Sequence, residues 1–282
     1  MAKGVTRHYT LNTMTETFAF LGTGSMGGAI LDGLLDSNHD VTVRATTSST
    51  TSTRARVESR SIADDADANR WAVTGATVVV VGVKPFAVLD VLEGLGDSLD
   101  PNALIISVAA GLTTASMESV IPNPVVRAMP NTPALVGKGV TGIAAGSRAT
   151  ADHLSRARAV FESVGWVLEL PENQIDALST ISGSGPAYVF HAAEKWTEAA
   201  VRIGFSENDA RALVEKTFAG ATALLEQSGV APAELRRRVT SPNGTTERAI
   251  AVLDGAHLDD VFTAAAEAAL ARAREIARDL GR

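Results

Sequence analysis

The fold of this chain is decided by the stretch FAFLGTGSMG at residues 18–27. Phe18–Leu21 is an apolar run of strand length, and apolar residues recur at helical spacing over Met26–Leu35. Gly22, Gly24 and Gly27 follow the apolar run in the pattern GxGxxG, and the third of them lies inside the helical pattern. The first glycine of such a loop permits a tight turn, the second lets the backbone approach a pyrophosphate, and the third lets helix and strand pack closely. The stretch therefore predicts a strand, a phosphate-binding loop and a helix.

The loop is expected to hold a dinucleotide, with its phosphates at the helix start, where backbone N–H groups lack helical partners. The alternative is a glycine-rich connection that binds nothing. A place near the start of the chain, between strand and helix, favours the dinucleotide. The residues expected to contact it are Gly22, Thr23, Gly24, Ser25, Met26 and Gly27.

Short apolar runs alternate with helical patterns through the first half of the chain. Thr77–Val83 is nearly pure valine, which is typical of a parallel strand buried on both faces. Helical spacing recurs between the runs, as in Phe86–Leu95. This alternation predicts an α/β fold, a Rossmann-type doubly wound parallel sheet. The other expected strands are Val41–Ala45, Ala103–Ala110, Val125–Ala128, Val140–Ala144 and Trp166–Leu170.

The second half of the chain has helical patterns only, at Pro186–Ile203, Ala210–Gln227 and Asp259–Leu280. Because these helices are rich in alanine, they would form a thin core alone, and a partner subunit is expected to complete it as a homodimer or higher homo-oligomer. We expect a dinucleotide-binding domain at residues 17–170 and an all-α dimerisation domain at 171–282. Residues 1–16 are polar and aperiodic, so we expect a disordered extension in which 1–13 are dispensable.

The end of the second expected strand bears on the choice of cofactor. A site that prefers NAD usually has an acidic residue there for the ribose 2′-hydroxyl. Here Arg44 is followed by a Ser/Thr run at residues 46–53 and then by Arg54 and Arg56. Cations and hydroxyls suit a 2′-phosphate, which a carboxylate would repel. NADPH is therefore the expected cofactor, with NADH as the alternative, and the Ser/Thr run could instead be a solvated loop.

Composition excludes several classes of protein. The 282 residues carry a formal net charge of −7, with Lys and Arg scattered, which argues against a nucleic-acid binder. The absence of cysteine excludes disulfides, thiolate nucleophiles and Cys-ligated metals. The five histidines are not paired at ligand spacing, so no metal site is expected. Because the apolar runs are of strand length and no signal-peptide core is evident, we expect a cytoplasmic protein without a membrane segment.

Several motifs, taken in order from Phe18 to Leu280, resemble the pyrroline-5-carboxylate reductase family. The most specific is Val239–Thr246, which reads VTSPNGTT and is similar to the family's signature ahead of a helix. The dinucleotide loop is another, and the rest are Val83–Pro85, Arg127–Pro133 and Ser182–Tyr188. One glycine loop would mean little, but all of these at family spacing make the resemblance specific.

The resemblance implies that 1-pyrroline-5-carboxylate is reduced to L-proline by hydride from NAD(P)H, the last step of proline biosynthesis. It implies that the helical domain also binds the substrate. It implies further cofactor contacts by Asn69 near the adenosine ribose, by the Val-Lys-Pro turn and by a loop near the nicotinamide, that is by Val83, Lys84, Pro85, Met129, Pro130 and Asn131. It implies substrate contacts by Ser241, Pro242, Asn243, Gly244, Thr245 and Thr246.

The segment 241–246 suits an imine that carries a carboxylate. A helix expected from about Thr245 presents backbone N–H groups that can hold a carboxylate without an arginine. By resemblance, the Thr246 hydroxyl points at the ring nitrogen, so Thr246 is the expected catalytic residue. No general acid is evident, and the substrate would arrive as an iminium or take its proton from water. The alternative is an ordinary Ser-Pro turn before a Thr-capped helix.

Two residues depart from the family pattern. Asn243 stands where the family usually has glycine, but asparagine tolerates left-handed backbone angles better than most residues. The loop is therefore expected to keep its shape. Thr77 stands where an acidic residue is common before the valine strand, and we expect no effect from it.

Two other functions stay open on the sequence alone. A β-hydroxyacid dehydrogenase-like reductase would need a catalytic lysine on a helix of the second domain, where Lys195 and Lys216 are the candidates. A non-catalytic nucleotide-binding protein would bind NADPH without oxidising it. His191, His257 and Glu198 are weaker candidates for proton transfer, since packing or solvated roles are commoner for such residues.

Overall fold

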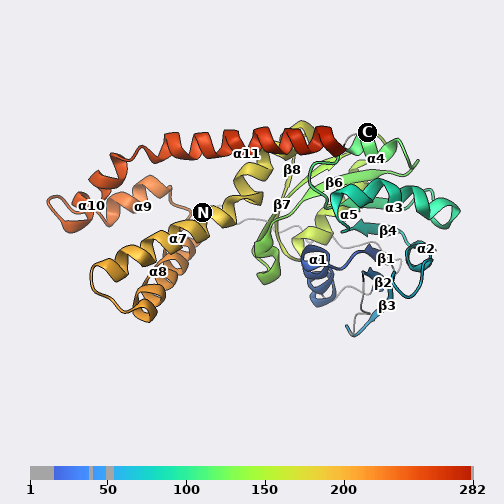
Figure 1. Ribbon diagram of the computed structural model, residues 1–282, viewed down its shortest axis with the longest axis horizontal. Helices are drawn as coiled ribbons and strands as arrows, with labels where there is room; N and C mark the ends of the chain where they lie inside the picture. The colour runs from blue at the N-terminus through green and yellow to red at the C-terminus, as the bar shows by residue number, and fades with distance from the viewer. Residues whose placement is uncertain (1–15, 38–40, 49–53, 281–282) are drawn as a thin grey trace. The chain divides into compact units, whose positions relative to one another are not determined.

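The computed structural model describes residues 16–37, 41–48 and 54–280 (Figure 1). The chain divides into two compact units. The described residues up to Ser184, with those from Ala269 onward, form the first unit, and Gly185–Ala268 forms the second. None of the described helices is both long enough and apolar enough to cross a membrane.

One sheet of eight strands runs through the first unit (Figure 1). The strands are β1 (Glu16–Leu21), β2 (Val41–Thr47), β3 (Val57–Ser61), β4 (Val78–Val81), β5 (Leu104–Ser107), β6 (Val125–Met129), β7 (Gly139–Ala145) and β8 (Gly165–Glu169). Their order is β3-β2-β1-β4-β5-β6-β7-β8. The first six strands are parallel and have the order of a Rossmann sheet, so the expected α/β class is confirmed.

The last two strands differ from the parallel sheet that the sequence predicts. β7 pairs antiparallel with β6, and β8 runs parallel to β7. Only residues 130–138 join β6 to β7, and they hold the short helix η3 (Thr132–Val136). A parallel neighbour needs a crossover of a dozen or more residues, so this connection favours a reversal of direction.

Helices cover both faces of the sheet because side chains alternate along buried strands. Phe18 and Phe20 of β1 pack on one face under α1 (Ser25–Asp36) and α5 (Ala151–Glu162). Ala19 and Leu21 pack on the other face. The helices there are α2 (Ala68–Val73), α3 (Val88–Leu95) and α4 (Thr114–Glu118). Every valine of β4 is buried, as expected of a strand covered on both sides.

β3 and α9 are among the elements that the sequence analysis did not expect. β3 reads VESRS, and because most of its residues are polar, it has no apolar run by which a strand could be recognised. It is the edge of the sheet, where short and charged strands are usual. α9 (Pro232–Arg238) is a short polar helix whose start is marked by proline in its first turn.

The expected boundary at 170/171 differs from the division that the structure shows, because residues 171–184 pack on the sheet. The Asp176 carboxylate forms an ion pair of 2.6 Å with Arg127 of β6, which is buried. The C-terminal residues also return to the first unit, where a Cβ on Gly111 would lie 2.8 Å from Ile276 and 3.3 Å from Leu280. At the other end of the chain, residues 1–15 lie outside the described residues. Glu16, expected in the loose extension, belongs to β1, and its carboxylate pairs with Arg156 at 2.8 Å.

The second unit is helical throughout its described length. α7 (Gly185–Arg202) and α8 (Glu207–Ser228) pack against each other, with the rings of Trp196 and Phe218 5.6 Å apart. After α9 come α10 (Thr245–Asp254) and α11 (Leu258–Leu280). The buried apolar side chains of this unit are those of Ala200, Ala210 and Val214. Such a small set cannot form a full core for Gly185–Ala268.

Candidate active site

The glycine loop after β1 is held against the end of β2 by Thr46. The Thr46 carbonyl accepts hydrogen bonds from the N–H groups of Gly22 at 3.2 Å and Thr23 at 3.1 Å. Gly22 has a φ of 88°, a left-handed conformation that favours glycine. The tight turn expected of the first glycine is therefore present.

Three glycines meet where the loop passes the end of β4. A Cβ atom on Gly27 would collide with the carbonyl oxygen of Gly22, and one on Gly82 would lie 2.6 Å from the same oxygen. Gly24 is different, because a Cβ there would meet no atom within 4 Å. The loop thus packs tightly at its ends and leaves bare backbone beside open space at its middle, which fits a bound pyrophosphate.

The start of α1 suits a negative charge. Its N-cap is Gly24, which has no side chain to occupy the N–H groups of the first turn. Ser25 is exposed, whereas Met26 packs against the buried core and anchors the helix start. Backbone N–H groups and the positive end of the helix dipole therefore face the site where phosphates are expected.

Asn69 lies at the same end of the sheet. Its Oδ1 atom accepts a hydrogen bond of 2.8 Å from the Thr46 hydroxyl, and the same hydroxyl accepts one from the Gly22 N–H at 3.3 Å. Thr46 thus connects Asn69 to the glycine loop, a role that the sequence analysis missed. The available signal was its place at the strand end, where NAD-preferring proteins have an acid.

The Val-Lys-Pro turn also borders the loop. A Cβ atom on Gly22 would lie 3.1 Å from Val83. Lys84, which is exposed, caps the short helix η1 (Pro85–Ala87), and Pro85 occupies its first turn. The structure thus brings together the glycine loop, Asn69 and this turn, which are far apart in sequence.

Arg44 has surroundings that the sequence did not predict. Its Nη1 atom donates to the carbonyls of Thr74 at 2.7 Å and Trp71 at 3.3 Å, at the end of α2. Its guanidinium lies 5.6 Å from the centre of the Trp71 ring, and its Nε atom is 3.8 Å from Glu58. A cation at a helix C-terminus stabilises the helix, so Arg44 has a structural role. Its contact with a cofactor stays a prediction, and residues 49–53 of the Ser/Thr run lie outside the described residues.

The loop expected near the nicotinamide follows β6. Pro130 is buried and Met129 is half-buried, with its Cε atom 3.1 Å from the position of a Cβ on Gly183. Asn131 is only 7% exposed. Its Nδ2 atom donates to the Ser182 carbonyl at 2.9 Å, and its Oδ1 atom accepts from the Val140 N–H at 2.8 Å. The Asn131 carboxamide is thus bonded within the protein, although the family resemblance implies a cofactor contact.

The segment 241–246 forms a tight turn in the second unit. Asn243 has a φ of 60°, so asparagine does adopt the left-handed conformation here. The Gly244 N–H donates to the Ser241 carbonyl at 3.0 Å, and a Cβ on Gly244 would lie 2.6 Å from the Ser241 hydroxyl. The Asn243 N–H donates to the Glu247 carboxylate at 2.8 Å. The turn is therefore fixed by its own backbone and by the first turn of α10.

Thr245 and Thr246 are the first residues of α10, whose N-cap is Gly244. Thr245 therefore does not cap the helix. Pro242 is exposed and Thr246 is half-buried. Among the described residues the Thr246 hydroxyl has no hydrogen-bond partner, so it can bond to a ligand at the helix start.

Comparison with known proteins shows what this chain is similar to. Residues 172–276 match the family described as pyrroline-5-carboxylate reductase dimerisation, and residues 17–111 match one described as NADP oxidoreductase, coenzyme F420-dependent. The pyrroline-5-carboxylate reductase of Pseudomonas aeruginosa is 39% identical over 95% of this chain and 99% of its own length. That of Mycobacterium tuberculosis is 37% identical over 92% and 96%.

The chain belongs to the pyrroline-5-carboxylate reductase family. Solved structures of the family agree. The reductase of Coxiella burnetii has a TM-score of 0.84 at 35% identity, covering 93% of this chain and 99% of that one. The Plasmodium falciparum pyrroline carboxylate reductase, solved with NADP bound, has a TM-score of 0.80 at 26% identity, covering 93% and 98%.

Lys195, one of the two lysines that a β-hydroxyacid dehydrogenase could use, does not suit that role in this family member. The Lys195 ammonium lies 2.8 Å from Glu194 and 2.7 Å from Glu198. Hydrogen bonds to these carboxylates raise the pKa of Lys195 above its ordinary value. A more basic ammonium gives up its proton less readily, so Lys195 is a poor acid catalyst.

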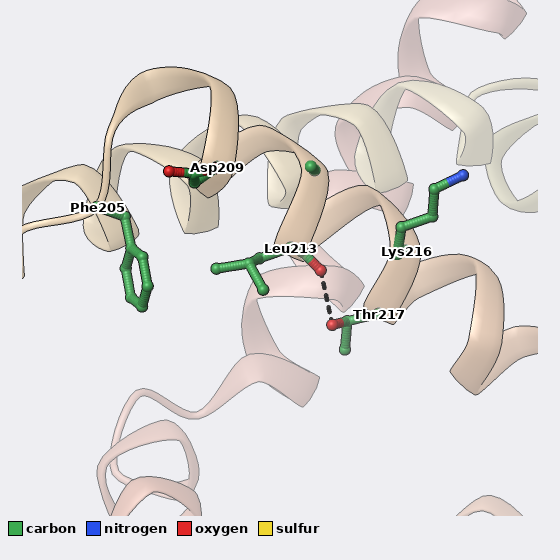
Figure 2. Close-up of a pocket in the computed structure, with 6 residues that line it drawn as sticks. Phe205, Asp209, Leu213, Lys216 and Thr217 are labelled. Atoms are coloured by element: carbon green, nitrogen blue, oxygen red, sulfur yellow. Dashed lines mark hydrogen bonds between the residues drawn. The ribbon is translucent and has the colours of Figure 1, made fainter.

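Lys216 lies beside a hollow of about 630 Å³ along α8 in the helical unit of this reductase (Figure 2). The hollow is lined by Phe205, Asp209, Ala212, Leu213, Lys216 and Thr217. Figure 2 shows the Thr217 hydroxyl bonded to the Leu213 carbonyl, at 2.7 Å, rather than presented to a ligand. Phe205 and Leu213 are about half exposed, so the hollow is part of the uncovered apolar surface of the unit.

Proposed function

We propose that this protein reduces the C=N bond of 1-pyrroline-5-carboxylate to give L-proline. The observation that carries the proposal is the 241–246 turn, whose left-handed Asn243 leads into a helix start without a side-chain cap. The names of its relatives, which are pyrroline-5-carboxylate reductases over almost their whole length, support the same reaction.

The cofactor is NAD(P)H, which supplies a hydride to the imine carbon when it is bound. The glycine loop and the start of α1 would hold its pyrophosphate, and Asn69 lies where the adenosine ribose is expected. The Val83–Pro85 turn and Met129–Pro130 would border the rest of the molecule.

The start of α10 would hold the substrate. Its backbone N–H groups bind the carboxylate, because they have no partner within the helix and the helix dipole favours a negative charge there. The Thr246 hydroxyl would bond to the ring nitrogen as that atom changes from a planar imine to an amine. The nitrogen gains its proton before hydride transfer, as an iminium, or from water, so no acidic side chain is needed.

We infer a preference for NADPH over NADH. The absence of an acid at the end of β2 supports it, since Thr46 and Thr47 stand there and neither repels a 2′-phosphate. The contribution of Arg44 is less direct than its charge suggests, because its guanidinium is bonded to the carbonyls of α2.

We also infer that the working protein is a homodimer joined through the helical unit. Large apolar side chains such as Ile203 and Val252 are more than 70% exposed in the single chain. An obligate interface buries on the order of 2,000 Å² or more, and this unit has apolar surface of the kind such an interface covers. The cytoplasmic location and the absence of nucleic-acid binding stay predictions from the sequence.

The direct test is to mix the purified full-length protein with NADPH and 1-pyrroline-5-carboxylate. We expect loss of the reduced cofactor and equimolar formation of L-proline, measured by absorbance and mass spectrometry. A β-hydroxyacid with NADP⁺ is the control and should give no turnover. Tight NADPH binding without oxidation in the presence of the imine would contradict the proposal and favour a nucleotide-binding protein.

A further inference from the structure

Pro186 leaves one carbonyl of a helix without its usual N–H donor, and the side chain of Asn131 supplies a donor in its place. Residues 175–202 run through α6 (Ile175–Leu178), the π-helical turn η5 (Ser179–Gly183) and α7. In a continuous α-helix the carbonyl of Ser182 would accept from the N–H of residue 186. Pro186 has no N–H, so that carbonyl needs another donor.

The missing donor comes from a side chain distant in sequence. The Nδ2 atom of Asn131 donates to the Ser182 carbonyl at 2.9 Å. The other end of the same carboxamide accepts from the Val140 N–H at 2.8 Å. Because one partner is an acceptor and the other a donor, only one orientation of the amide satisfies both. The orientation of the Asn131 carboxamide is therefore fixed by one hydrogen bond at each end.

Met129, the last residue of β6, lies close to the same turn. Its Cε atom is 3.1 Å from the position of a Cβ on Gly183, so a larger residue there would require this flexible side-chain end to shift. Met129 and Asn131 thus lie beside two adjacent residues of η5. This turn lies immediately before Gly185, the first residue of the helical unit. Single π-helical turns within helices are frequent at functional sites.

We propose that Asn131 is a positioning residue for the reduction. Its carboxamide replaces the helix bond that Pro186 removes, and so holds the Met129–Asn131 loop against the turn that leads into the substrate-binding unit. The inference rests on the proposed function, since this loop is expected beside the reacting end of the cofactor. Its effect is on turnover, because small displacements of a positioned group cost much more rate than binding.

The test compares Asn131→Ala in the wild-type background and in Pro186→Ala. Asn131→Ala should lower kcat about tenfold, while the Kd for NADP⁺, measured by calorimetry, changes by less than about twofold because the phosphates are held elsewhere. Pro186→Ala restores an N–H that can donate to Ser182. In that background the loss caused by Asn131→Ala should shrink to about twofold.

Asn123→Ala is the matched control. Asn123 is also a buried amide of the first unit, and its Nδ2 atom donates to the carbonyls of Asp100 at 2.8 Å and Ala103 at 3.0 Å. Its replacement should lower the melting temperature without lowering kcat. If Asn131→Ala does not fold, Asn131→Asp takes its place, because it keeps an acceptor for Val140 and puts an acceptor, which repels the carbonyl, in place of the donor to Ser182.

Three results would overturn the inference. They are an unchanged kcat in folded Asn131→Ala, an equal loss of kcat in both backgrounds, and a tenfold weaker NADP⁺ affinity that indicates direct contact with the cofactor. Hydrogen exchange of residues 179–188 separates this inference from the proposed function. Faster exchange in Asn131→Ala, reversed by Pro186→Ala, is expected whether or not the wild-type protein reduces the imine.

Discussion

The sheet unit and the helical unit bury their apolar residues to very different extents. In the sheet unit, two clusters fill both faces of the sheet, and large side chains such as Phe18, Phe20 and Phe161 are fully buried. In the helical unit the buried apolar side chains are two alanines and a valine, Ala200, Ala210 and Val214. The helical unit is richer in alanine, so many of its apolar side chains are small, and large ones such as Ile203 and Val252 are exposed in the single chain.

The difference shows where each unit obtains its stability. Burial of apolar area contributes about 25 cal/mol per Å², and only surface removed from water counts. The sheet unit buries its apolar surface within a single chain. The helical unit leaves it exposed until a second chain covers it, so its stability depends on protein concentration.

The largest effect is expected in the core of the sheet unit. Phe20→Ala should lower the free energy of unfolding by about 3–5 kcal/mol, because it leaves a cavity in a fully buried site. Urea denaturation at two protein concentrations measures this cost, which should be the same at both. A loss of less than about 1 kcal/mol in the free energy of unfolding would contradict the idea that the sheet unit is stabilised by its own core.

A charge on the exposed face of the helical unit should disrupt assembly. Phe262 is 57% exposed in the single chain, and Phe262→Asp should weaken the dimer by about 100-fold or more, since a buried unpaired carboxylate costs several kcal/mol. Light scattering over a dilution series measures this. Ile62→Asp, at a similarly exposed apolar residue of the sheet unit, is the control and should leave the dimer intact. If the wild-type protein is a stable monomer at micromolar concentration, the comparison fails.

Thr246→Ala tests the helical unit as the substrate-binding half. It should lower kcat/KM for 1-pyrroline-5-carboxylate by about 10- to 100-fold, the value of one hydrogen bond in a dry site, while NADPH affinity stays the same. Thr245→Ala is the control, since that residue does not cap α10 and should change little. Unchanged kcat/KM in folded Thr246→Ala would make Thr246 structural and turn attention to Glu198 or bound water.

Arg44→Ala separates two roles in the sheet unit. If Arg44 contacts the 2′-phosphate, the ratio of NADP⁺ to NAD⁺ affinity should fall about tenfold, as expected for a charge-assisted bond. If it only holds the end of α2, both affinities should change together with the melting temperature. Arg60→Ala is the control, because its guanidinium lies 4.2 Å from the same Trp71 ring.

The smallest effect concerns pH and is confined to the sheet unit. Burial and the neighbouring Arg156 lower the pKa of His153, whose Nδ1 atom accepts from the Thr150 N–H at 3.0 Å at the start of α5. The pKa of His153 is lower in the folded than in the unfolded protein. The stabilisation that neutral His153 gives to the folded protein is therefore complete above about pH 6.5 and is lost as the pH falls through the folded pKa. His153→Gln keeps an acceptor that does not titrate. Its melting temperature should depend less on pH between 7 and 5, as measured by calorimetry, and an identical dependence would contradict the role of His153.

Local patterns in the sequence predicted the parts of the fold that depend on neighbours in the chain. The glycine loop, the strand before it and the helix after it lie in one stretch, and each glycine has the packing expected of it. The left-handed Asn243 was foreseen for the same reason, since one residue's conformational preference decides it.

Features that depend on distant partners were not foreseen. Arg44 was expected at a phosphate, but its partners at Trp71 and Thr74 are 27 and 30 residues away. The amide of Asn131 bonds to Ser182, 51 residues on. The reversal of β7 is a choice of pairing partner, which an apolar run does not reveal. No spacing in the sequence marks such contacts.

The path of α11 has a consequence for biosynthesis. This helix starts in the helical unit, but its residues from Ala269 onward belong to the sheet unit, where Ile276 and Leu280 contact Gly111. A ribosome releases the chain from its N-terminus, and domains generally fold as units in that order. The first half of this protein is synthesised early but lacks these contacts until α11 has been synthesised. Completion of the sheet unit therefore waits until α11 has left the ribosome.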